Sequence, residues 1–323
     1  PMMTTQDTGK RTAWQSERGK LLKALGQNSD HCAWAVLMHL WMDKKVVRRV
    51  LCKKYGLSYE RMQAAFFERR HIAESLAQVG FLSKTFAESE AQDKQESCDT
   101  SPPDWNLVRA AIAGGLFPNV AKAERSTPKF SGLSSPGDRN KNMKYVVMQS
   151  TVSPNGALDH YPKACNMHPN SLCFGADALQ CPFVAFYTLQ QTTKLFVYDA
   201  TEASAWALLL FSGKQPEWDP RDKRINLGPW ASFPCERGDL LMDLIRDARQ
   251  SLQAVLARKL RDPKFKPEER APELHAYAEV LRTGGLGFVP SRSSEPSWPL
   301  LDQLREESEA YTDQLEAEQE LKA

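Results

Sequence analysis

Short apolar runs separated by polar turns dominate the middle of the chain, from residue 164 to residue 213. Residues 183–189 and 194–198 are rich in aromatic and β-branched side chains, which favour strands. The polar stretch 190–193 between them has the length of a hairpin connection. Residues 144–148 form another strand-like run, so the pattern predicts a β domain here. Its core is expected to hold the alternating residues Phe183, Phe186, Phe196 and Phe211.

Helical spacing of apolar residues precedes the β domain. Asp30 is a good N-cap for a helix that carries Trp34, Leu37 and Trp41 at helical spacing, and residues 59–79 form a second helical pattern. Between them, residues 44–54 contain six bases and no acid. On a helix these bases would fall on one side at four-residue spacing. The run could track phosphates or form a solvated helix face, and the sequence leaves both open.

Helical spacing also follows the β domain. Residues 236–260 predict a helix, and residues 271–281 predict a second, shorter one. The inward face of the first is expected to carry Leu240, Leu244, Ala248, Leu252 and Val255. Residues 301–321 place a few leucines among many glutamates, which is typical of a solvated helix or of a tail that binds a partner.

These patterns predict an α+β protein with four parts. Residues 1–122 form a helical domain, with a flexible, acidic and serine-rich insertion near 86–103. Residues 123–235 form the β domain, residues 236–290 a helical extension, and residues 291–323 an acidic tail.

Charge and cysteine content indicate the type of partner and the cellular compartment. The net charge of +2 hides an asymmetry, because residues 300–323 contain eight acids and two bases and the rest is basic. A basic body indicates a polyanionic partner. Seven cysteines at irregular spacing indicate free thiols in a reducing compartment. We expect the cytoplasm or the nucleus, with the mitochondrion as the alternative, and no apolar run is long enough to cross a membrane.

Several motifs in the β domain follow a family order. Together they resemble the C-terminal oligonucleotide-binding (OB) fold of DEAH/RHA-type RNA helicases: His-Pro-Asn-Ser at 168–171, Pro-Phe-Val-Ala-Phe-Tyr at 182–187, Val-Tyr-Asp-Ala-Thr at 197–201 and Ala-Leu-Leu-Leu-Phe-Ser-Gly at 207–213. Upstream, Asn-Ser-Asp-His at 28–31 and the segment 110–121 resemble the helical, ratchet-like domain of the same helicases. The resemblance covers about residues 20–265.

The resemblance implies a helical bundle followed by a five-stranded OB-fold β-barrel, over about residues 144–211, and C-terminal helices. It implies that the chain grips single-stranded RNA through cations and stacking aromatics. The candidate RNA-binding residues are Lys44, Arg48, Lys53, Lys144, Lys163, His168, Asn170, Lys194 and Tyr198. Cys181-Pro182-Phe183 departs from the family's Pro-Trp, which puts a stacking aromatic there in doubt.

The motor motifs of the helicases are missing from this sequence. It has no phosphate loop and no Asp-Glu-x-His box, so we expect no ATP hydrolysis by this chain. ATP and magnesium are expected only for motor domains supplied in cis or in trans. We therefore predict the RNA-binding accessory region of an ATP-dependent helicase. The alternative is a motor-less platform that docks protein partners at the OB face or the acidic tail, in a ribonucleoprotein complex.

The sequence gives little support for a metal site or for a catalytic nucleophile. Cys165, His168 and Cys173 lack a fourth ligand at an orthodox spacing, and cysteines in apolar strands are usually core residues. No Gly-x-Ser-x-Gly elbow is present. We expect neither a metal site nor a catalytic residue in this chain.

Overall fold

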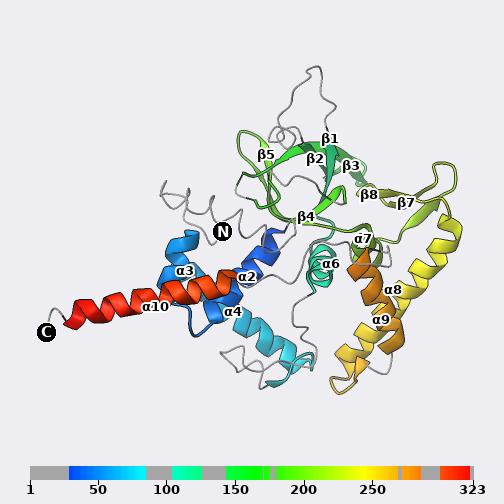
Figure 1. The fold of residues 1–323 in the computed structure, drawn as a ribbon. Helices are drawn as coiled ribbons and strands as arrows, with labels where there is room; N and C mark the ends of the chain where they lie inside the picture. The colour runs from blue at the N-terminus through cyan, green and yellow to red at the C-terminus, as the bar shows by residue number, and fades with distance from the viewer. Residues whose placement is uncertain are drawn as a thin grey trace.

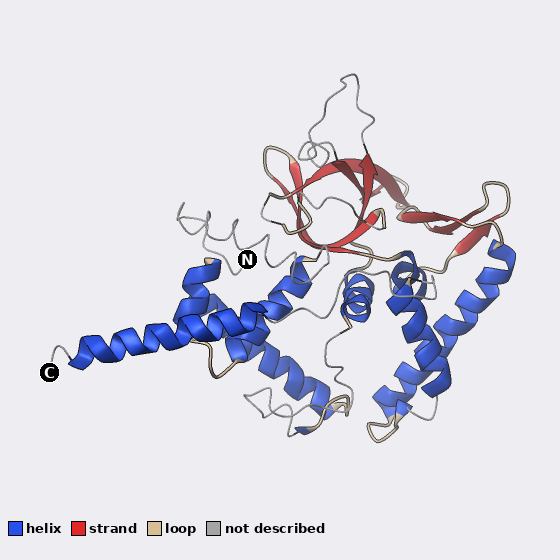
Figure 2. Ribbon diagram, viewed as in Figure 1, coloured by secondary structure: helices blue, strands red, loops and turns tan. Residues whose placement is uncertain are grey.

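The structure is a computed structural model with a β-barrel and two groups of helices, which lie below the barrel in the view of Figures 1 and 2. It describes residues 29–84, 104–125, 143–169, 171–174, 179, 181–267, 271–284 and 299–320. The insertion predicted near 86–103 and the candidate residue Asn170 lie outside the described residues. No helix in the described ranges is long and apolar enough to cross a membrane.

Three helices form the first group: α2 (Asp30–Met42), α3 (Arg48–Tyr55) and α4 (Tyr59–Gln78). Their shared core contains fully buried large side chains, among them Leu37, Trp41, Leu51 and Met62. The N-cap of α2 is Ser29, whose hydroxyl accepts a hydrogen bond from the Cys32 N–H. The prediction that Asp30 caps this helix was therefore wrong by one residue, because the Asp30 side chain bonds elsewhere.

The predicted basic helix over 44–54 is interrupted. Lys44 and Lys45 lie in a turn, where the Asp43 carboxylate accepts a hydrogen bond from the Lys45 N–H at 2.8 Å. Only from Arg48 onward are the bases helical. An aspartate that bonds the backbone two residues ahead stabilises a turn in competition with a helix. The bases consequently do not form one continuous helical stripe.

The barrel is closed and has the strand order β1-β2-β3-β5-β4. β3 and β5 pair in parallel and the other neighbours are antiparallel. The strands are β1 (Val120–Arg125), β2 (Met143–Val152), β3 (Leu158–Met167), β4 (Phe183–Gln191) and β5 (Leu195–Glu202). The predicted α+β class with a five-stranded OB-type barrel is confirmed.

The predicted limits of the barrel were wrong at both ends. The first strand begins at Val120, inside the segment assigned to the helical domain, and alternates small buried residues with the exposed pair Lys122 and Glu124. At the other end, α7 (Ala205–Phe211) is a helix. It lacks β-branched residues and four consecutive side chains, 207–210, are buried, as expected for a helix enclosed on all sides.

The helix that precedes the barrel packs directly on α7. α6 (Trp105–Leu116) contains two consecutive glycines, Gly114 and Gly115, near its C-terminal end. A Cβ atom at Gly114 would lie 2.6 Å from the Phe211 Cβ, so glycine permits the close approach of the two helices.

A three-stranded sheet and two helices complete this side of the molecule. The sheet has β6 (Glu217–Asp219), β7 (Arg224–Leu227) and β8 (Ala231–Pro234). The long α8 (Gly238–Arg261) and α9 (Ala271–Thr283) follow it. They share a core with α6, α7 and the end of the barrel, which includes Phe183, Leu208, Ile225, Leu227 and Ile245.

The inward face of α8 differs from the predicted one. Leu240 and Leu244 are 58% and 65% exposed, whereas Ile245 and Ala248 are buried. The helix is rotated so that Arg249 also faces inward. Its guanidinium donates to the Leu209 and Ser212 carbonyl oxygens, both at 2.7 Å, and satisfies the C-terminal end of α7. The hydrophobic pattern of α8 does not indicate that carbonyl groups at the end of α7 require hydrogen-bond donors from α8.

The last helix returns to the first group. α10 (Pro299–Glu320), within the predicted acidic tail, contacts α3 (Figure 1). Leu304 is completely buried in the core of the first helical group, and the second half of α10 extends away from the other elements (Figure 1).

Replacing Arg249 by leucine is expected to destabilise the fold by roughly 2–4 kcal/mol, because two buried carbonyl groups lose charged donors. Arg246→Leu, one turn earlier on α8, is the matched control. Arg246 is exposed and pairs with Asp243, so the free energy of unfolding should change by less than about 0.5 kcal/mol. Urea unfolding of both variants measures this difference, and equal losses would contradict the capping role.

Candidate nucleic-acid interface

Asp30, the first residue of α2, is a buried carboxylate that connects the helical group to the barrel. Its Oδ2 atom accepts hydrogen bonds from the Ser171 hydroxyl at 2.6 Å and from the Ala200 N–H at 2.8 Å. Its Oδ1 atom accepts from the Leu172 N–H. Burial raises the pKa of Asp30 to about 6, although the three donors oppose this shift. We call these three hydrogen bonds the Asp30 clasp.

The neighbours of Asp30 extend the contact with β5. The Ser29 hydroxyl lies 2.8 Å from Thr201 Oγ1, and His31 Nδ1 lies 2.7 Å from the same oxygen. Thr201 is buried, and burial lowers the pKa of His31 below its usual value. Three consecutive side chains at the start of α2 therefore bind the barrel.

The motifs that carry the helicase resemblance meet at this place. Described parts of 28–31, 168–171 and 197–201 supply the carboxylate, the Ser171 hydroxyl and the Ala200 N–H. Much of the resemblance thus reflects a structural junction between a helix and a barrel. It does not by itself mark residues that touch a ligand.

An aromatic surface lies next to the clasp. The His168 ring stacks on the Tyr198 ring with centroids 4.1 Å apart, and it makes a T-shaped contact with the Phe196 ring, with centroids 5.7 Å apart. All three side chains are partly exposed. Phe196, which was expected in the core, belongs to this surface because it alternates with buried Leu195 and Val197. Ring stacks of this kind can accept a nucleobase.

Two lysines, Lys163 in the middle of β3 and Lys194 just before β5, lie close in sequence to the residues of the aromatic surface. Lys194 is exposed in the turn between β4 and β5, two residues before Phe196. Lys163 precedes Asn166, which pairs with Phe196 in the parallel β3–β5 ladder. Lys163 is half-buried, because it is opposite Val147 and so lies on the inner side of β3. Lys144 is exposed on β2, opposite Glu124.

The three predicted residues of the basic run lie on the first helical group instead of the barrel. Lys44 and Lys53 are exposed there. Arg48 has a packing role: its guanidinium lies 5.0 Å from the centroid of the Trp41 ring, and its Nε atom donates to the Trp41 carbonyl oxygen. The sequence candidates thus separate into a barrel set and a helical set, and RNA contact stays a prediction for each residue.

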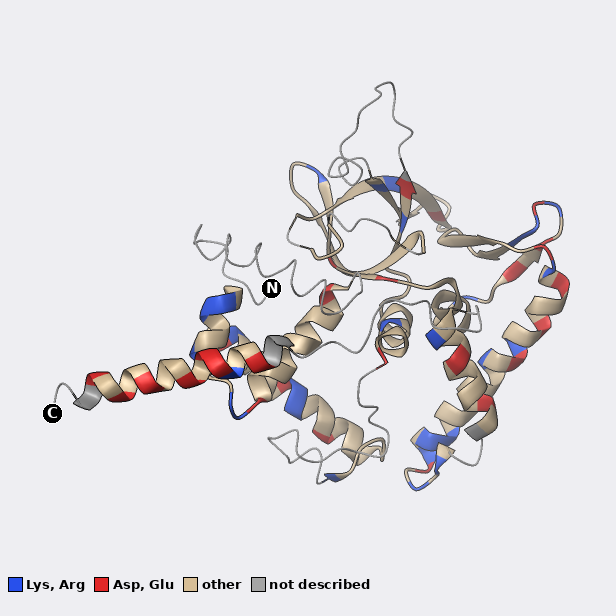
Figure 3. Cartoon of the chain, in the orientation of Figure 1, with Lys and Arg blue, Asp and Glu red and all other residues tan. Residues whose placement is uncertain are grey.

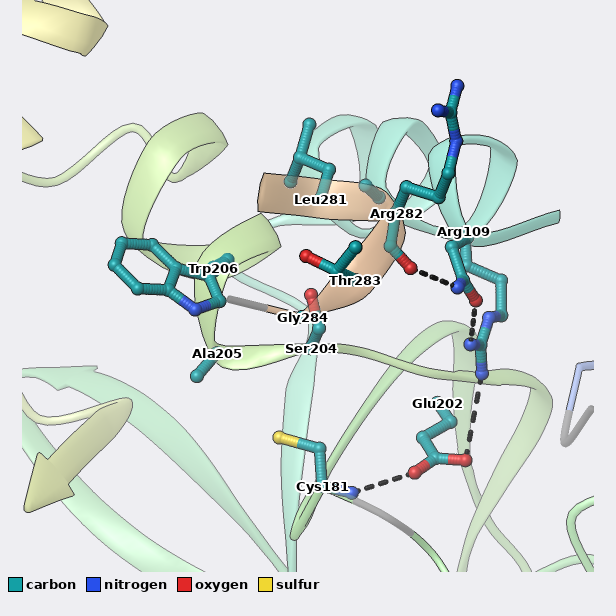
Figure 4. A pocket seen from close by; sticks show the side chains of 12 residues that line it. Arg109, Cys181, Glu202, Ser204, Ala205, Trp206, Leu281, Arg282, Thr283 and Gly284 are labelled. Carbon is teal, nitrogen blue, oxygen red and sulfur yellow. Dashed lines mark hydrogen bonds and ion pairs between the residues drawn. The ribbon is translucent and has the colours of Figure 1, made fainter. Parts of the chain in front are cut away.

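A cavity of about 430 Å³ lies behind the barrel, between α6, α7 and the end of α9 (Figure 4). Its polar wall is internally bonded. The buried Glu202 carboxylate accepts from the Cys181 N–H at 2.7 Å and pairs with Arg109 at 3.7 Å. Burial raises the pKa of the Cys181 thiol to about 11, so the thiol is protonated at neutral pH. This arrangement joins α6 to the barrel and offers no activated nucleophile.

The cysteines considered as metal ligands are barrel core residues. Burial raises the pKa of Cys165 to about 12, and the Cys173 thiol donates to the Ala200 carbonyl oxygen. The described residues hold no group of three or more His, Cys, Asp or Glu side chains able to bind a metal ion.

Comparison with known proteins agrees with this geometry. Residues 108–215 match the model of the oligonucleotide/oligosaccharide-binding (OB)-fold family. The chain contains an OB-fold domain. The matched segment begins within α6 and includes the whole barrel and α7.

Most of the chain is also similar to helicases. It is 22% identical over 260 residues to the ATP-dependent DNA/RNA helicase DHX36 of Mus musculus, which covers 79% of this chain and 23% of that protein. It is 22% identical over 216 residues to the DExH-box ATP-dependent RNA helicase DExH1 of Arabidopsis thaliana, which covers 67% of this chain and 18% of that protein. The chain therefore spans about a fifth of these relatives' lengths. The predicted resemblance to DEAH-type helicases is confirmed at this level.

Sequence reasoning missed the residues that hold the OB-fold domain in place. Ser171, Ala200 and Thr201 were quoted as parts of motifs, without their contacts to α2. The available signal was the co-occurrence of the Ser-Asp-His and His-Pro-Asn-Ser motifs in one chain. Their hydrogen bonds span about 140 to 170 residues of sequence, so local patterns do not reveal them.

Asp30→Asn is expected to lower the free energy of unfolding by about 1–3 kcal/mol, because an amide cannot accept from all three donors. The loss should be larger at pH 4.5 than at pH 7. A pKa raised by burial means that the folded state binds a proton at Asp30 more tightly than the unfolded state, so this site adds stability as pH falls through about 6.

Urea unfolding of the parent and Asp30→Asn at both pH values measures this difference. Asp313→Asn, at an exposed position of α10, is the control and should show no such pH effect. Equal losses for Asp30→Asn at pH 4.5 and pH 7 would show that the carboxyl is ionised in the folded protein throughout this range.

Proposed function

We propose that this chain is the RNA-gripping accessory region of an ATP-dependent DEAH/RHA-type RNA helicase. Bases of single-stranded RNA stack on the aromatic surface of His168, Phe196 and Tyr198. Lys194 neutralises phosphates beside it. Motor domains, in cis or in trans, bind ATP and magnesium and supply the energy.

The stacked pair of His168 and Tyr198 carries this proposal. Stacking on an aromatic side chain tolerates any base, because every base has a π-face. An adjacent lysine adds affinity through phosphates, again without reading sequence. This combination suits a region that must hold RNA of any sequence as it moves past a motor.

The position of the aromatic surface supports coupling to a motor. Ser171, three residues after His168, and Ala200, two residues after Tyr198, both donate to Asp30. A displacement of α2 would therefore move both segments that carry the stacked rings. In the proposed helicase, movement of the helical group by a motor would change the grip on RNA.

One observation favours the second candidate, a platform for protein partners. The outer face of the β2–β3 hairpin has no charged side chain over four cross-strand pairs: Val146–Ala164, Met148–Pro162, Ser150–His160 and Val152–Leu158. Val152 and Leu158 are 72% and 63% exposed. An uncharged face with exposed aliphatic residues suits a protein surface better than a phosphate backbone.

Tyr198→Ala is expected to weaken binding of an unstructured uridine-rich RNA by about 5- to 150-fold, because one aromatic stack contributes about 1–3 kcal/mol. Lys194→Gln should reduce the slope of log K against log salt by about 0.7, the value for one phosphate contact of a single strand. Fluorescence anisotropy with the full chain across a range of salt concentrations measures both effects.

Tyr187→Ala is the matched control, since Tyr187 is an exposed aromatic residue of the neighbouring strand β4 outside the aromatic surface. It should bind RNA like the parent. Equal weakening by Tyr187→Ala and Tyr198→Ala would remove the special role of the aromatic surface. A parent chain that fails to bind RNA would favour the protein platform.

A further inference from the structure

The start of α10 docks on the surface formed by α2, α3 and the turn between them. Leu304 is 0% exposed and packs into the core of the first helical group, and Ser308, one turn later, is 1% exposed. The Val47 N–H, at the N-cap of α3, donates to the Ser308 hydroxyl at 3.0 Å. Ser308 thus satisfies a backbone donor at the start of α3, where no side chain of α3 itself does so.

Two ion pairs flank this docked turn. Lys54 Nζ lies 2.8 Å from Glu307 Oε1, and Arg305 donates to the Asp43 carboxylate at 2.6 Å. Asp43 directly precedes the basic run 44–54, and Lys54 is its last residue. The sequence identifies this run as a candidate site for phosphates. Glu307 of the docked helix therefore pairs with Lys54, one of the bases of this run.

The charges of the two surfaces are complementary. The run 44–54 has six bases and no acid, whereas residues 302–309 of α10 have four acids and one base. Figure 3 shows acidic positions along α10 and basic positions on the neighbouring α3. The acid paired with Lys54 lowers the positive potential that a phosphate backbone would meet at this part of α3.

We infer that α10 is an internal competitor for nucleic acid: its acidic first half occupies the basic surface of α3, and single-stranded RNA phosphates bind that surface only when this half is displaced or neutralised. The inference rests on the proposed function, because it assigns a regulation to the RNA-binding region. Either RNA phosphates or the Glu306, Glu307 and Glu309 carboxylates would lie in the positive potential of the α3 bases, but not both at once.

The contact is suited to exchange. Glu307 is 39% exposed, and a partly exposed ion pair contributes little to stability. Leu304 is the apolar anchor of the docked turn. Displacement of this half would also expose the buried Leu304 side chain, which phosphate contacts at low salt must offset.

A charge-neutralising variant of the full chain tests the competition. E306Q/E307Q/E309Q removes Glu307, which pairs with Lys54, and two exposed acids of the same turns, and it keeps Leu304 and Ser308. It should bind an unstructured uridine-rich RNA about three- to tenfold more tightly than the parent at about 0.1 M salt. The slope of log K against log salt should steepen by about 0.7 for each additional phosphate that the protein neutralises.

The matched control is E316Q/E318Q, which removes two acids from the exposed second half of the same helix. A rise of about 1.5 Å per residue places Glu316 about 14 Å beyond Glu307, farther than the Debye length of about 10 Å at 0.1 M salt. This variant should bind within about twofold of the parent. As a second readout, saturating RNA should speed amide hydrogen exchange at residues 302–309 of the parent.

Each outcome decides one question. Tighter binding by the first variant alone, with faster exchange in α10 when RNA is bound, supports the competition. Equal affinities in all three proteins, or equal increases in both variants, overturn the competition and leave the proposed function intact. No RNA binding by any of the three proteins overturns the proposed function and the competition together.

Discussion

A carboxylate buried between a helix and a β-barrel must be hydrogen-bonded, because removing a charge from water without partners costs several kcal/mol. Asp30 meets this constraint with three donors that come from two segments of the barrel domain. The loop after β3 and the end of β5 are therefore fixed relative to α2. The aromatic surface lies on these same two segments, so its geometry depends on Asp30.

α6 also connects the helical and barrel parts, because its side chains contribute to two hydrophobic cores. Trp105, Val108 and Ile112 pack against the core of the first helical group, whereas Ala110 and Ala113 belong to the core beneath the barrel. A helix with apolar residues on two sides can serve two cores at once. Together with the Asp30 clasp it makes the helical and barrel parts one mechanical unit. Such a unit can transmit a movement of the helices to the barrel.

Much of the barrel could be predicted, because strands β4 and β5 combine β-branched and aromatic residues with a short polar turn. Three features could not. α7 has an apolar run that suits a buried strand or a buried helix, and only its enclosure decides. The turn at Asp43 depends on one side-chain hydrogen bond, and the inward face of α8 depends on the carbonyl groups of α7 that Arg249 satisfies. Of the candidate site, His168 and Tyr198 were predicted, but their stacking requires the parallel pairing of β3 with β5, which no local pattern encodes.

The central claim, that the Asp30 clasp fixes the aromatic surface proposed to bind RNA, is tested most directly by comparing RNA affinity in two variants that both destabilise the fold. Asp30→Asn acts beside the aromatic surface, and Arg249→Leu acts beneath α7. At a temperature where both variants are fully folded, we predict that Asp30→Asn binds single-stranded RNA more weakly than the parent and that Arg249→Leu binds like the parent. Equal affinities for the two variants would contradict the claim.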